Sequence, residues 1–319
     1  MKAADASSHP ADLPEVAVVM LAHGHLEMTV SALTGVINTD YPRYHVLLVD
    51  NGSEGGFSTS IKVRFPSVEL LSLPVNLGTP AGFNRGLQSA QKIWDPDYFV
   101  LMDNDVVISD PRWLKELVGV AVRSGAAAVG PAVVEPSAGK GGRRLYFRGE
   151  LKYMYFPPYY LFSRFRGPRR MALARVNIPI YYDSLVGACL LLSARALKRV
   201  GLYDEGYSPH GLADGDLCFR MWENGESVVY DPRVTVTHFG GATTGKRLVQ
   251  DVRARTKLAR DHWNRFFFFL SLPFFLLPSP QELRQLGFGF GDIPKRVRGV
   301  ALGLVAPTRV AKFAERNRY

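Results

Sequence analysis

The sequence predicts an α/β protein with a mostly parallel, doubly wound sheet, and two observations carry this prediction. Short apolar runs that suit buried parallel strands alternate with segments whose apolar residues recur at helical spacing. Several of these runs end directly in Asp, Asn or Gly, as strands do when they enter a turn. Such units place a ligand at the carboxyl edge of the sheet.

The first half of the chain supplies the strands that carry the polar ends. We expect strands at 16–22, 46–49, 68–73 and 98–102, and helices at 26–37 and 80–91. The turns after three of these strands read Asp50-Asn51-Gly52-Ser53, Asn76-Leu77-Gly78 and Asp103-Asn104-Asp105. These turns therefore meet at one edge of the predicted sheet.

The second half is less regular. We expect helices at 113–123 and 194–200, strands at 127–134, 184–192 and 228–238, and a helical run at 217–222. Between these elements, residues 143–170 hold nine aromatic residues, eight basic ones and one acid. This composition suits a Tyr-rich strand pair packed on the sheet and, equally, a surface that binds a sugar or a phosphate-bearing acceptor.

Composition excludes several classes of protein. With 47% hydrophobic and 21% charged residues among 319, the chain is neither disordered nor collagen-like. Two cysteines cannot form a disulfide framework or a four-thiolate zinc site, which favours a cytoplasmic protein. The polar segment 1–14 has no apolar stretch after Lys2, so we expect neither a signal peptide nor a transit peptide.

The net charge of +10 lies entirely in the tail. Residues 1–245 hold 24 basic and 24 acidic side chains, whereas 246–319 hold 15 and 5. We therefore divide the chain into a polar N-terminal tail (1–14), a main domain (15–245, with halves at 15–110 and 111–245) and a basic, aromatic extension (246–319). A basic extension suggests nucleic acid or an anionic membrane as partner.

Paired carboxylates after a buried strand are the strongest local signal. Asp103 and Asp105 follow the apolar run YFVLM, so both emerge at the sheet edge, where their repulsion calls for a cation. Oxygen ligands favour Mg²⁺ or Mn²⁺. The simpler explanations are a turn for this pair, a helix N-terminus for Asp214 and Asp216, and a capped or core imidazole for His238.

Seven segments in one order make the pattern specific. They are VDNGS (49–53), NLGTPAGFNRG (76–86), MDND (102–105), VGACLLLSARAL (186–197), VGLYDE (200–205), DGDLCFRMWENG (214–225) and HFGGAT (238–243). Over about residues 16–244 the chain resembles the family 2 glycosyltransferases, in their bacterial rhamnosyltransferase-like branch. The resemblance implies a GT-A fold, with a Rossmann-like, mostly parallel sheet flanked by helices and followed here by a C-terminal helical tail. It also implies that residues 15–245 form the catalytic domain, in which 15–110 is the half that binds the nucleotide sugar and 111–245 the half that binds the acceptor.

The resemblance also implies roles for individual residues. Asp214 matches the proposed general base, Asp216 and Gly187 fall at the acceptor side, and Asp103, Asp105 and His238 match the metal site that includes the DXD motif. The positions expected at the donor are Ala22, Asp50, Asn51, Ser53, Asn76, Gly78, Gly82, Asn84, Asp103 and Asn104. The chain departs from the family at Ala213, where a Glu normally precedes the base, which leaves the orientation of that base or the binding of the acceptor hydroxyl open.

The implied reaction is an inverting transfer of a sugar from a UDP- or dTDP-sugar to a hydroxyl of a cell-envelope or lipid-linked glycan. A metal would offset the charge on the departing diphosphate, and a carboxylate would take the proton of the hydroxyl. One alternative is a sugar-1-phosphate nucleotidylyltransferase, although residues 22–27 (AHGHLE) are not its Gly-rich, basic phosphate loop. Another is an inactive relative that binds sugar or membrane, for which Ala213 is the only hint.

The tail contains the run FFFFLSLPFFLL at 266–277, between basic flanks. Twelve residues interrupted by Pro273 are too few to cross a bilayer, which needs about 20. They suit interfacial insertion at the inner face of the cell membrane, with Phe267, Phe268, Phe274 and Phe275 as the inserting side chains; the alternative is a helix packed on the catalytic domain. Nucleic acid is not expected as a partner, because its binding segments intersperse aromatic and charged residues.

Overall fold

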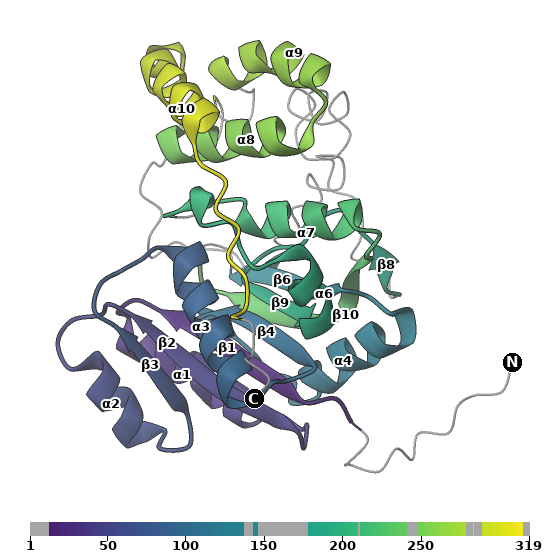
Figure 1. The fold of residues 1–319 in the computed structure, drawn as a ribbon. Coiled ribbons are helices and arrows are strands. Elements are labelled where there is room, and N and C mark those ends of the chain that lie inside the picture. Colours follow the sequence, from purple (N-terminus) through teal and green to yellow (C-terminus); the bar gives the residue numbers. More distant parts are fainter. Residues whose placement is uncertain are drawn as a thin grey trace, which may run out of the picture.

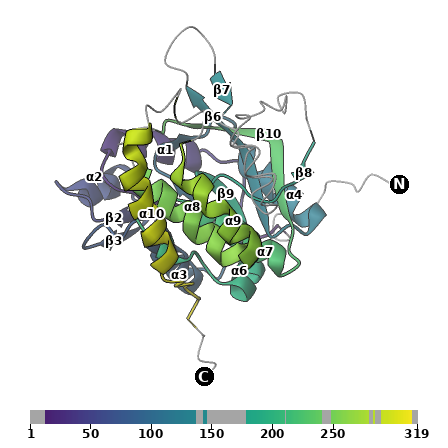
Figure 2. The same ribbon diagram turned by 90° about the horizontal axis from the view of Figure 1, so that it is seen from above.

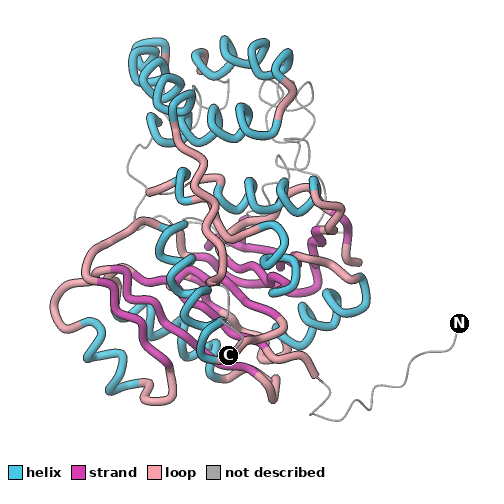
Figure 3. Tube along the Cα trace, in the orientation of Figure 1, coloured by secondary structure: helices cyan, strands magenta, loops and turns pink. Residues whose placement is uncertain are grey.

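A ten-stranded mixed sheet forms the centre of the molecule, with helices on both of its faces (Figure 1). The computed structural model describes residues 13–136, 143–145, 178–209, 211–240, 248–278, 283 and 289–314. The strand order is β3-β2-β1-β4-β9-β6-β10-β5, with β7 paired to β6 and β8 paired to β10. Figure 3 shows the same layers as a trace.

The first half confirms the predicted alternation of strands and helices. Its strands β1, β2, β3 and β4 pair in parallel. The bounds are β1 Val16–Ala22, α1 Leu26–Ile37, β2 Tyr44–Asn51, α2 Phe57–Arg64, β3 Glu69–Leu73, α3 Thr79–Ile93 and β4 Tyr98–Asp103. Helix α2 was not predicted, because only Phe57 and Ile61 of it are buried and the apolar spacing of a helix is therefore missing.

The second half of the sheet is mixed, because β9 runs antiparallel between β4 and β6. In this half of the sheet, among the described strands, only β6 and β10 pair in parallel. The bounds are β5 Val106–Val107, α4 Trp113–Ser124, β6 Ala128–Pro136, β7 Arg143–Leu145, β8 Ile180–Tyr181, β9 Cys189–Ser193, α6 Ala194–Val200, η4 Glu205–Tyr207, α7 Ala213–Glu223 and β10 Val228–His238. The aromatic and basic stretch at 143–170 lies outside the described residues beyond β7.

Strand β1 explains why the sheet needs helices on both faces. All seven of its residues are buried, and successive side chains of a strand point to opposite faces. Ala17, Val19 and Leu21 belong to the core that includes α3, α6, α7 and the tail. Val16, Val18 and the other even-numbered residues belong to the core with α1, α2 and α4.

The tail forms a further helical layer over α7, on the side away from the sheet (Figure 1). Its elements are α8 Leu248–His262, α9 Arg265–Leu276, η6 Phe290–Asp292 and α10 Ile293–Val305. Figure 2 shows α8, α9 and α10 side by side above the part of the chain that forms the sheet. After α10 the chain returns to the domain, where the Leu202 amide donates to the Ala311 carbonyl at 2.7 Å and Phe99 stacks on Phe313.

The phenylalanine run is divided between core and surface. Phe268 and Phe275 are buried, so their predicted insertion into a membrane is wrong; they pack against the core below α9. Phe267 and Phe274 are half-buried, and Phe274 packs against the same core. The exposed aromatic residue at the centre of the run is instead Phe269. Among the described helices, none is long and apolar enough to cross a membrane.

Candidate active site

The carboxyl ends of β1, β2 and β4 gather the side chains that the sequence singled out. In the parallel register, Ala22 pairs with Asp50, and Leu21 pairs with Asp103. The polar turns after the three strands therefore meet at one edge, as the pattern predicts. Asn104 lies at the same edge, where its side chain donates to Thr29 Oγ1 at 2.7 Å.

Asn51 organises the expected donor loop. Its Oδ1 accepts from the Leu77 amide at 3.0 Å, and its Nδ2 donates to Asn76 Oδ1 at 3.1 Å. Asn76 Oδ1 also accepts from the Gly78 amide at 2.8 Å. Gly82 belongs to this arrangement, because a Cβ there would come within 3.1 Å of Asn51 Nδ2. These contacts fix the backbone of residues 76–78 beside the sheet edge.

Asp50 closes the neighbouring turn. It is only 4% exposed, and its carboxylate accepts from the Ser53 amide at 2.8 Å and from the hydroxyl of Ser58. Ser53 in turn accepts from the Gly24 amide at 2.7 Å, which joins the turns after β1 and β2. Contact of Asp50 or Ser53 with a donor stays a prediction.

Asn84 has a structural position. It is fully buried in α3, with Nδ2 donating to the Tyr203 carbonyl at 2.9 Å and Oδ1 accepting from the Tyr203 amide at 3.0 Å. Glu205 Oε1 takes a further hydrogen bond from Nδ2 at 3.1 Å. The side chain holds α3 to the 203–205 segment, and this geometry gives no support to its predicted contact with the donor.

Asp103, Asp105 and His238 come together as the sequence predicts. One ligand-type atom from each lies within 4.8 Å of the other two, and all three side chains are partly accessible. The antiparallel pairing of β10 with β5 sets His238 opposite Val106, next to Asp105. His238 Nε2 is consequently 3.2 Å from Asp105 Oδ1. Two carboxylates and one imidazole are a donor set that suits Mg²⁺ or Mn²⁺.

The carboxylates of this cluster lie close enough together to affect one another's ionisation. The pKa of Asp103 is raised to about 7, mainly by burial and also by the neighbouring charge of Asp105, while the charge of His238 opposes the rise. The charge of Asp214 acts on the pKa of Asp103 in the same direction as that of Asp105. The two segments are also in contact, because the Asp103 amide donates to the carbonyl of Ala188, the residue after Gly187, at 3.0 Å. The edge therefore concentrates negative charge that a cation would offset.

Asp214 is held rigidly at the start of α7. Its Oδ2 accepts from the Gly187 amide at 2.8 Å, and its Oδ1 accepts from the Gly215 amide at 2.9 Å. Leu212, just before the helix, has φ of 54°, and this turn brings residue 214 toward Gly187. Neither amide depends on the side chain at position 213, so the absence of the family's Glu at Ala213 leaves the Asp214 carboxylate in place.

Asp216 points into the protein. It is 3% exposed, its Oδ2 accepts from Arg220 Nε at 2.9 Å, and its Oδ1 lies 2.9 Å from His262 Nε2. Both oxygens are thus engaged within the chain, and the geometry gives no support to an acceptor contact. His262, which the sequence analysis missed, instead joins α8 to α7. A lone histidine in a basic segment gives no signal of this pairing.

A second acidic cluster, of Asp204, Asp216 and Asp261, is neutralised by the chain itself. The fully buried Lys257 lies 2.7 Å from Asp204 Oδ2 and also pairs with Asp261. This cluster is a buried ionic network and not a metal site.

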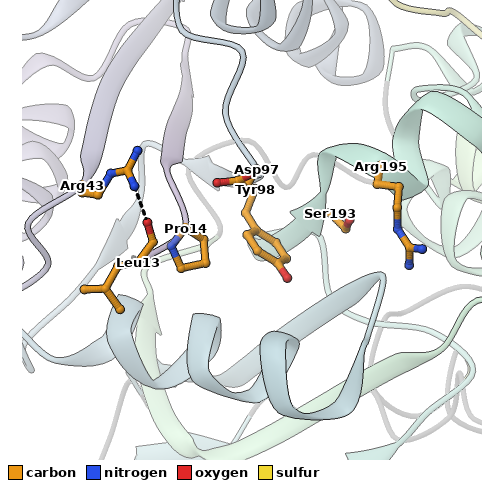
Figure 4. A pocket seen from close by; sticks show the side chains of 7 residues that line it. All are labelled: Leu13, Pro14, Arg43, Asp97, Tyr98, Ser193 and Arg195. Atoms are coloured by element: carbon orange, nitrogen blue, oxygen red, sulfur yellow. Dashed lines mark hydrogen bonds between the residues drawn. The ribbon is translucent and has the colours of Figure 1, made fainter. Parts of the chain in front are cut away.

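A separate hollow of about 400 Å³ lies at the other edge of the sheet (Figure 4). Pro14 comes just before β1, and Asp97 just before β4, which places the hollow at their amino ends. Its lining residues are Leu13, Pro14, Arg43, Asp97, Tyr98, Ser193 and Arg195. It shares no residue with the cluster at the carboxyl edge.

Comparison with known proteins identifies the family of the chain. Residues 17–189 match the model of the family described as glycosyl transferase family 2. The chain is 30% identical, over 77% of its length and 81% of the relative, to the N-acetylglucosaminyl-diphospho-decaprenol L-rhamnosyltransferase of Mycobacterium tuberculosis. It is 26% identical to the O-antigen biosynthesis protein RfbC of Myxococcus xanthus, over 64% of the chain and 16% of that protein.

Two solved structures share the fold. GalNAc-T7 with UDP, GalNAc and Mn²⁺ superposes with a TM-score of 0.58 at 15% identity, covering 93% of this chain and 59% of that one. The mannosyltransferase PcManGT from Pyrobaculum calidifontis, in complex with GDP-Man and Mn²⁺, has a TM-score of 0.55 at 14% identity, with coverages of 96% and 80%.

Proposed function

The chain belongs to glycosyl transferase family 2 and is a glycosyltransferase, and from this premise we propose that it is an inverting, divalent-metal-dependent enzyme. Its donor would be a UDP- or dTDP-sugar, and its acceptor a hydroxyl of a lipid-linked or other cell-envelope glycan. The observation that carries the proposal is the convergence of Asp103, Asp105 and His238, together with the link to Asp214 through Gly187 and Ala188.

The three clustered residues fit a divalent ion. Their ligand atoms converge within 4.8 Å while all three remain partly open, which leaves room for a diphosphate to complete the coordination shell. A bound Mg²⁺ or Mn²⁺ would stabilise the negative charge that develops on the departing nucleoside diphosphate. Both structural neighbours were solved with Mn²⁺ and a nucleotide, which supports this choice.

On the acceptor side, Asp214 would take the proton of the attacking hydroxyl. The amides of Gly187 and Gly215 fix one oxygen each, so the carboxylate keeps one orientation while lone pairs remain for the hydroxyl. Because the carboxylate is already fixed before the acceptor binds, its orientation costs no further conformational entropy during the reaction. A single displacement by that hydroxyl inverts the anomeric centre and needs no nucleophilic side chain.

Around the donor, the loop at residues 76–78 and the turn at 50–53 would carry the nucleotide. Asn51 and Asp50 build these backbone segments and fix them, which is the form of support that a preorganised binding site needs. Gly78 has φ of 81°, and a Cβ there would meet the Pro209 backbone at 2.8 Å. The loop therefore packs directly on the acceptor half of the domain.

A lipid-linked acceptor is supported by the mycobacterial relative, whose name specifies a decaprenol-linked diphosphate sugar. We propose that this chain likewise acts in the cytoplasm, peripherally at the inner face of the cell membrane. An inactive relative is the alternative that Ala213 suggests, whereas the family match leaves no support for a nucleotidylyltransferase.

A thermal-shift panel tests the donor site. UDP, dTDP and their sugars are added with Mn²⁺, with EDTA, and to an Asp105→Ala variant, because a ligand that binds only the folded state raises the melting temperature. At least one nucleotide should stabilise the parent in Mn²⁺ and lose most of that effect in EDTA and in Asp105→Ala. Equal shifts in all three settings would contradict the metal site, and no shift with any nucleotide would contradict the donor class.

A further inference from the structure

Exposed apolar side chains concentrate on α9 and α10. Of the 18 large apolar side chains that are exposed among the described residues, ten belong to the tail. On α9 the most exposed are Phe266 at 69% and Phe269 at 63%, with Leu270 beside them. The exposed residues of η6 and α10 are Phe290, Val297, Leu302, Leu304 and Val305. A group of this size on one layer marks an interaction surface.

Helix α9 is apolar on two sides. In α9, Phe268 and Phe275 are buried against the core, whereas Phe266, Phe269 and Leu270 project away from it. A surface helix of an ordinary globular domain would carry polar residues on the outward side. Folding of the chain therefore accounts for only one side of α9.

Tight packing fixes the position of this layer. A Cβ at Gly299 would come within 2.8 Å of Val252, and one at Gly303 within 2.5 Å of Thr256, so α10 lies very close to α8. The fully buried Arg296 donates to the Phe275 carbonyl of α9 at 3.4 Å. The outward apolar side chains thus belong to a rigid three-helix layer.

Positive charge accompanies the apolar group. Arg265 begins α9, and Lys295 and Arg298 lie exposed on α10. Asp292, the acid nearest to Lys295 in sequence, is half-buried and is paired with Lys295 at 2.8 Å. Exposed phenylalanines bordered by cations match the acyl boundary and the anionic headgroups of a bilayer surface.

We propose that the outer face of α9 and α10 docks on an anionic lipid bilayer and turns the acceptor side of the active site toward it. We call this face the tail face; it comprises Phe266, Phe269, Leu270, Phe290, Val297, Leu302, Leu304 and Val305 with Arg265, Lys295 and Arg298. The layer rests on α7, the helix whose first turn holds Asp214 (Figure 1). His262 of α8 contacts Asp216 of α7 directly, at 2.9 Å. The inference extends the proposed function, since a docked enzyme would meet a lipid-linked acceptor near its base.

Vesicle co-sedimentation of the full chain tests the proposal. The vesicles contain either neutral lipid alone or about a third of anionic phosphatidylglycerol, at low and high salt. The parent should bind the anionic vesicles, and salt should weaken this binding only in part, because salt screens the charges but not the apolar contact.

Two double variants separate the apolar and charged contributions. Phe266→Ser with Phe269→Ser should lower the partition coefficient more than about tenfold. Lys295→Glu with Arg298→Glu should lower it on anionic vesicles by at least about fivefold for each cation. The matched controls are Val63→Ser with Val122→Ser, and Lys92→Glu with Lys115→Glu, which alter exposed residues of other faces. Both controls should bind like the parent.

Binding of the phenylalanine variant equal to that of the parent would overturn the proposal, as would loss of binding in the controls. A different outcome is that the parent does not bind vesicles but forms a dimer, and that Phe266→Ser with Phe269→Ser dissociates this dimer. The tail face would then bind a second copy of the chain, and the bilayer proposal would be wrong. Donor hydrolysis without vesicles is measured for every variant and should not change. If the parent binds vesicles but hydrolyses no donor, the proposed function fails while the docking proposal stands.

Discussion

The contact between His262 and Asp216 should make the stability of the protein depend on pH in a defined direction. Burial opposes the charged imidazolium, but hydrogen bonds to Asp216 and Glu223 outweigh it and raise the pKa of His262 to about 9. Relative to the ordinary value of 6.5, this corresponds to about 3 kcal/mol of stabilisation. The His262 side chain is only 4% exposed, so solvent screens the interaction little.

The sign follows from the raised pKa. Below pH 6.5 both the folded and the unfolded chain hold the proton, and the full stabilisation is present; it is lost as the pH rises through about 9. His262→Gln removes the charge at every pH. The variant should therefore be less stable than the parent by about 3 kcal/mol at pH 6, and the difference should shrink toward zero above pH 9.5.

Equilibrium unfolding in urea, followed by tryptophan fluorescence from pH 6 to pH 10, measures this difference. The control is His45→Gln, because His45 also contacts a glutamate, Glu15 at 2.8 Å, but is 38% exposed. It should change the free energy of unfolding by less than about 1 kcal/mol. A difference between parent and His262→Gln that stays constant with pH, or grows as the pH rises, would refute the charged pair.

The site gives four further predictions. Asp214→Asn should lower the transfer rate by about 10² to 10⁴ with donor binding nearly unchanged, and a parental rate in steady-state assays would remove Asp214 from the mechanism. Asp216→Asn should instead lower the free energy of unfolding in urea by about 3 kcal/mol, because it breaks a buried ion pair, and the protein that remains folded should keep its activity. A variant of normal stability that has lost activity would make Asp216 a catalytic residue and not a structural one. Asp105→Ala and His238→Ala should each weaken Mn²⁺-dependent binding of a nucleoside diphosphate by at least about tenfold in calorimetry, and a parental titration for His238→Ala would make that histidine structural. Gly187→Ala would place a Cβ 3.2 Å from the Asp214 carboxylate, so its rate should fall by up to about 10² while the donor KM stays constant; a parallel rise in KM would place Gly187 at the donor instead.

The part of the site that lies on the parallel sheet was predictable from the sequence. The carboxyl ends of parallel strands necessarily meet at one edge, so apolar runs followed by Asp50 and Asp103 predict neighbouring side chains. The antiparallel insertion of β9 was not predictable, because its apolar run has the same pattern in either direction.

Contacts that depend on tertiary packing also could not be predicted from the sequence. Nothing in the local pattern distinguishes Asp214, which lies at the site, from Asp216, which is buried two residues later in the same helical turn. The position of α8 decides between them, because it brings His262 against one carboxylate only. Similarly, the run at 266–277 has no clear polar face, and only the packing of α9 shows that Phe268 is core and Phe269 is surface.

The central claim is that this chain uses a metal-dependent donor site with Asp214 as base, and donor turnover tests it most directly. Purified protein is incubated with UDP- and dTDP-sugars, and release of the nucleoside diphosphate is measured in Mn²⁺, in EDTA and in the Asp105→Ala variant. We predict release from at least one donor in Mn²⁺, abolished by EDTA and by Asp105→Ala. Release that persists unchanged in EDTA and in Asp105→Ala, or no release from any donor, would contradict the account.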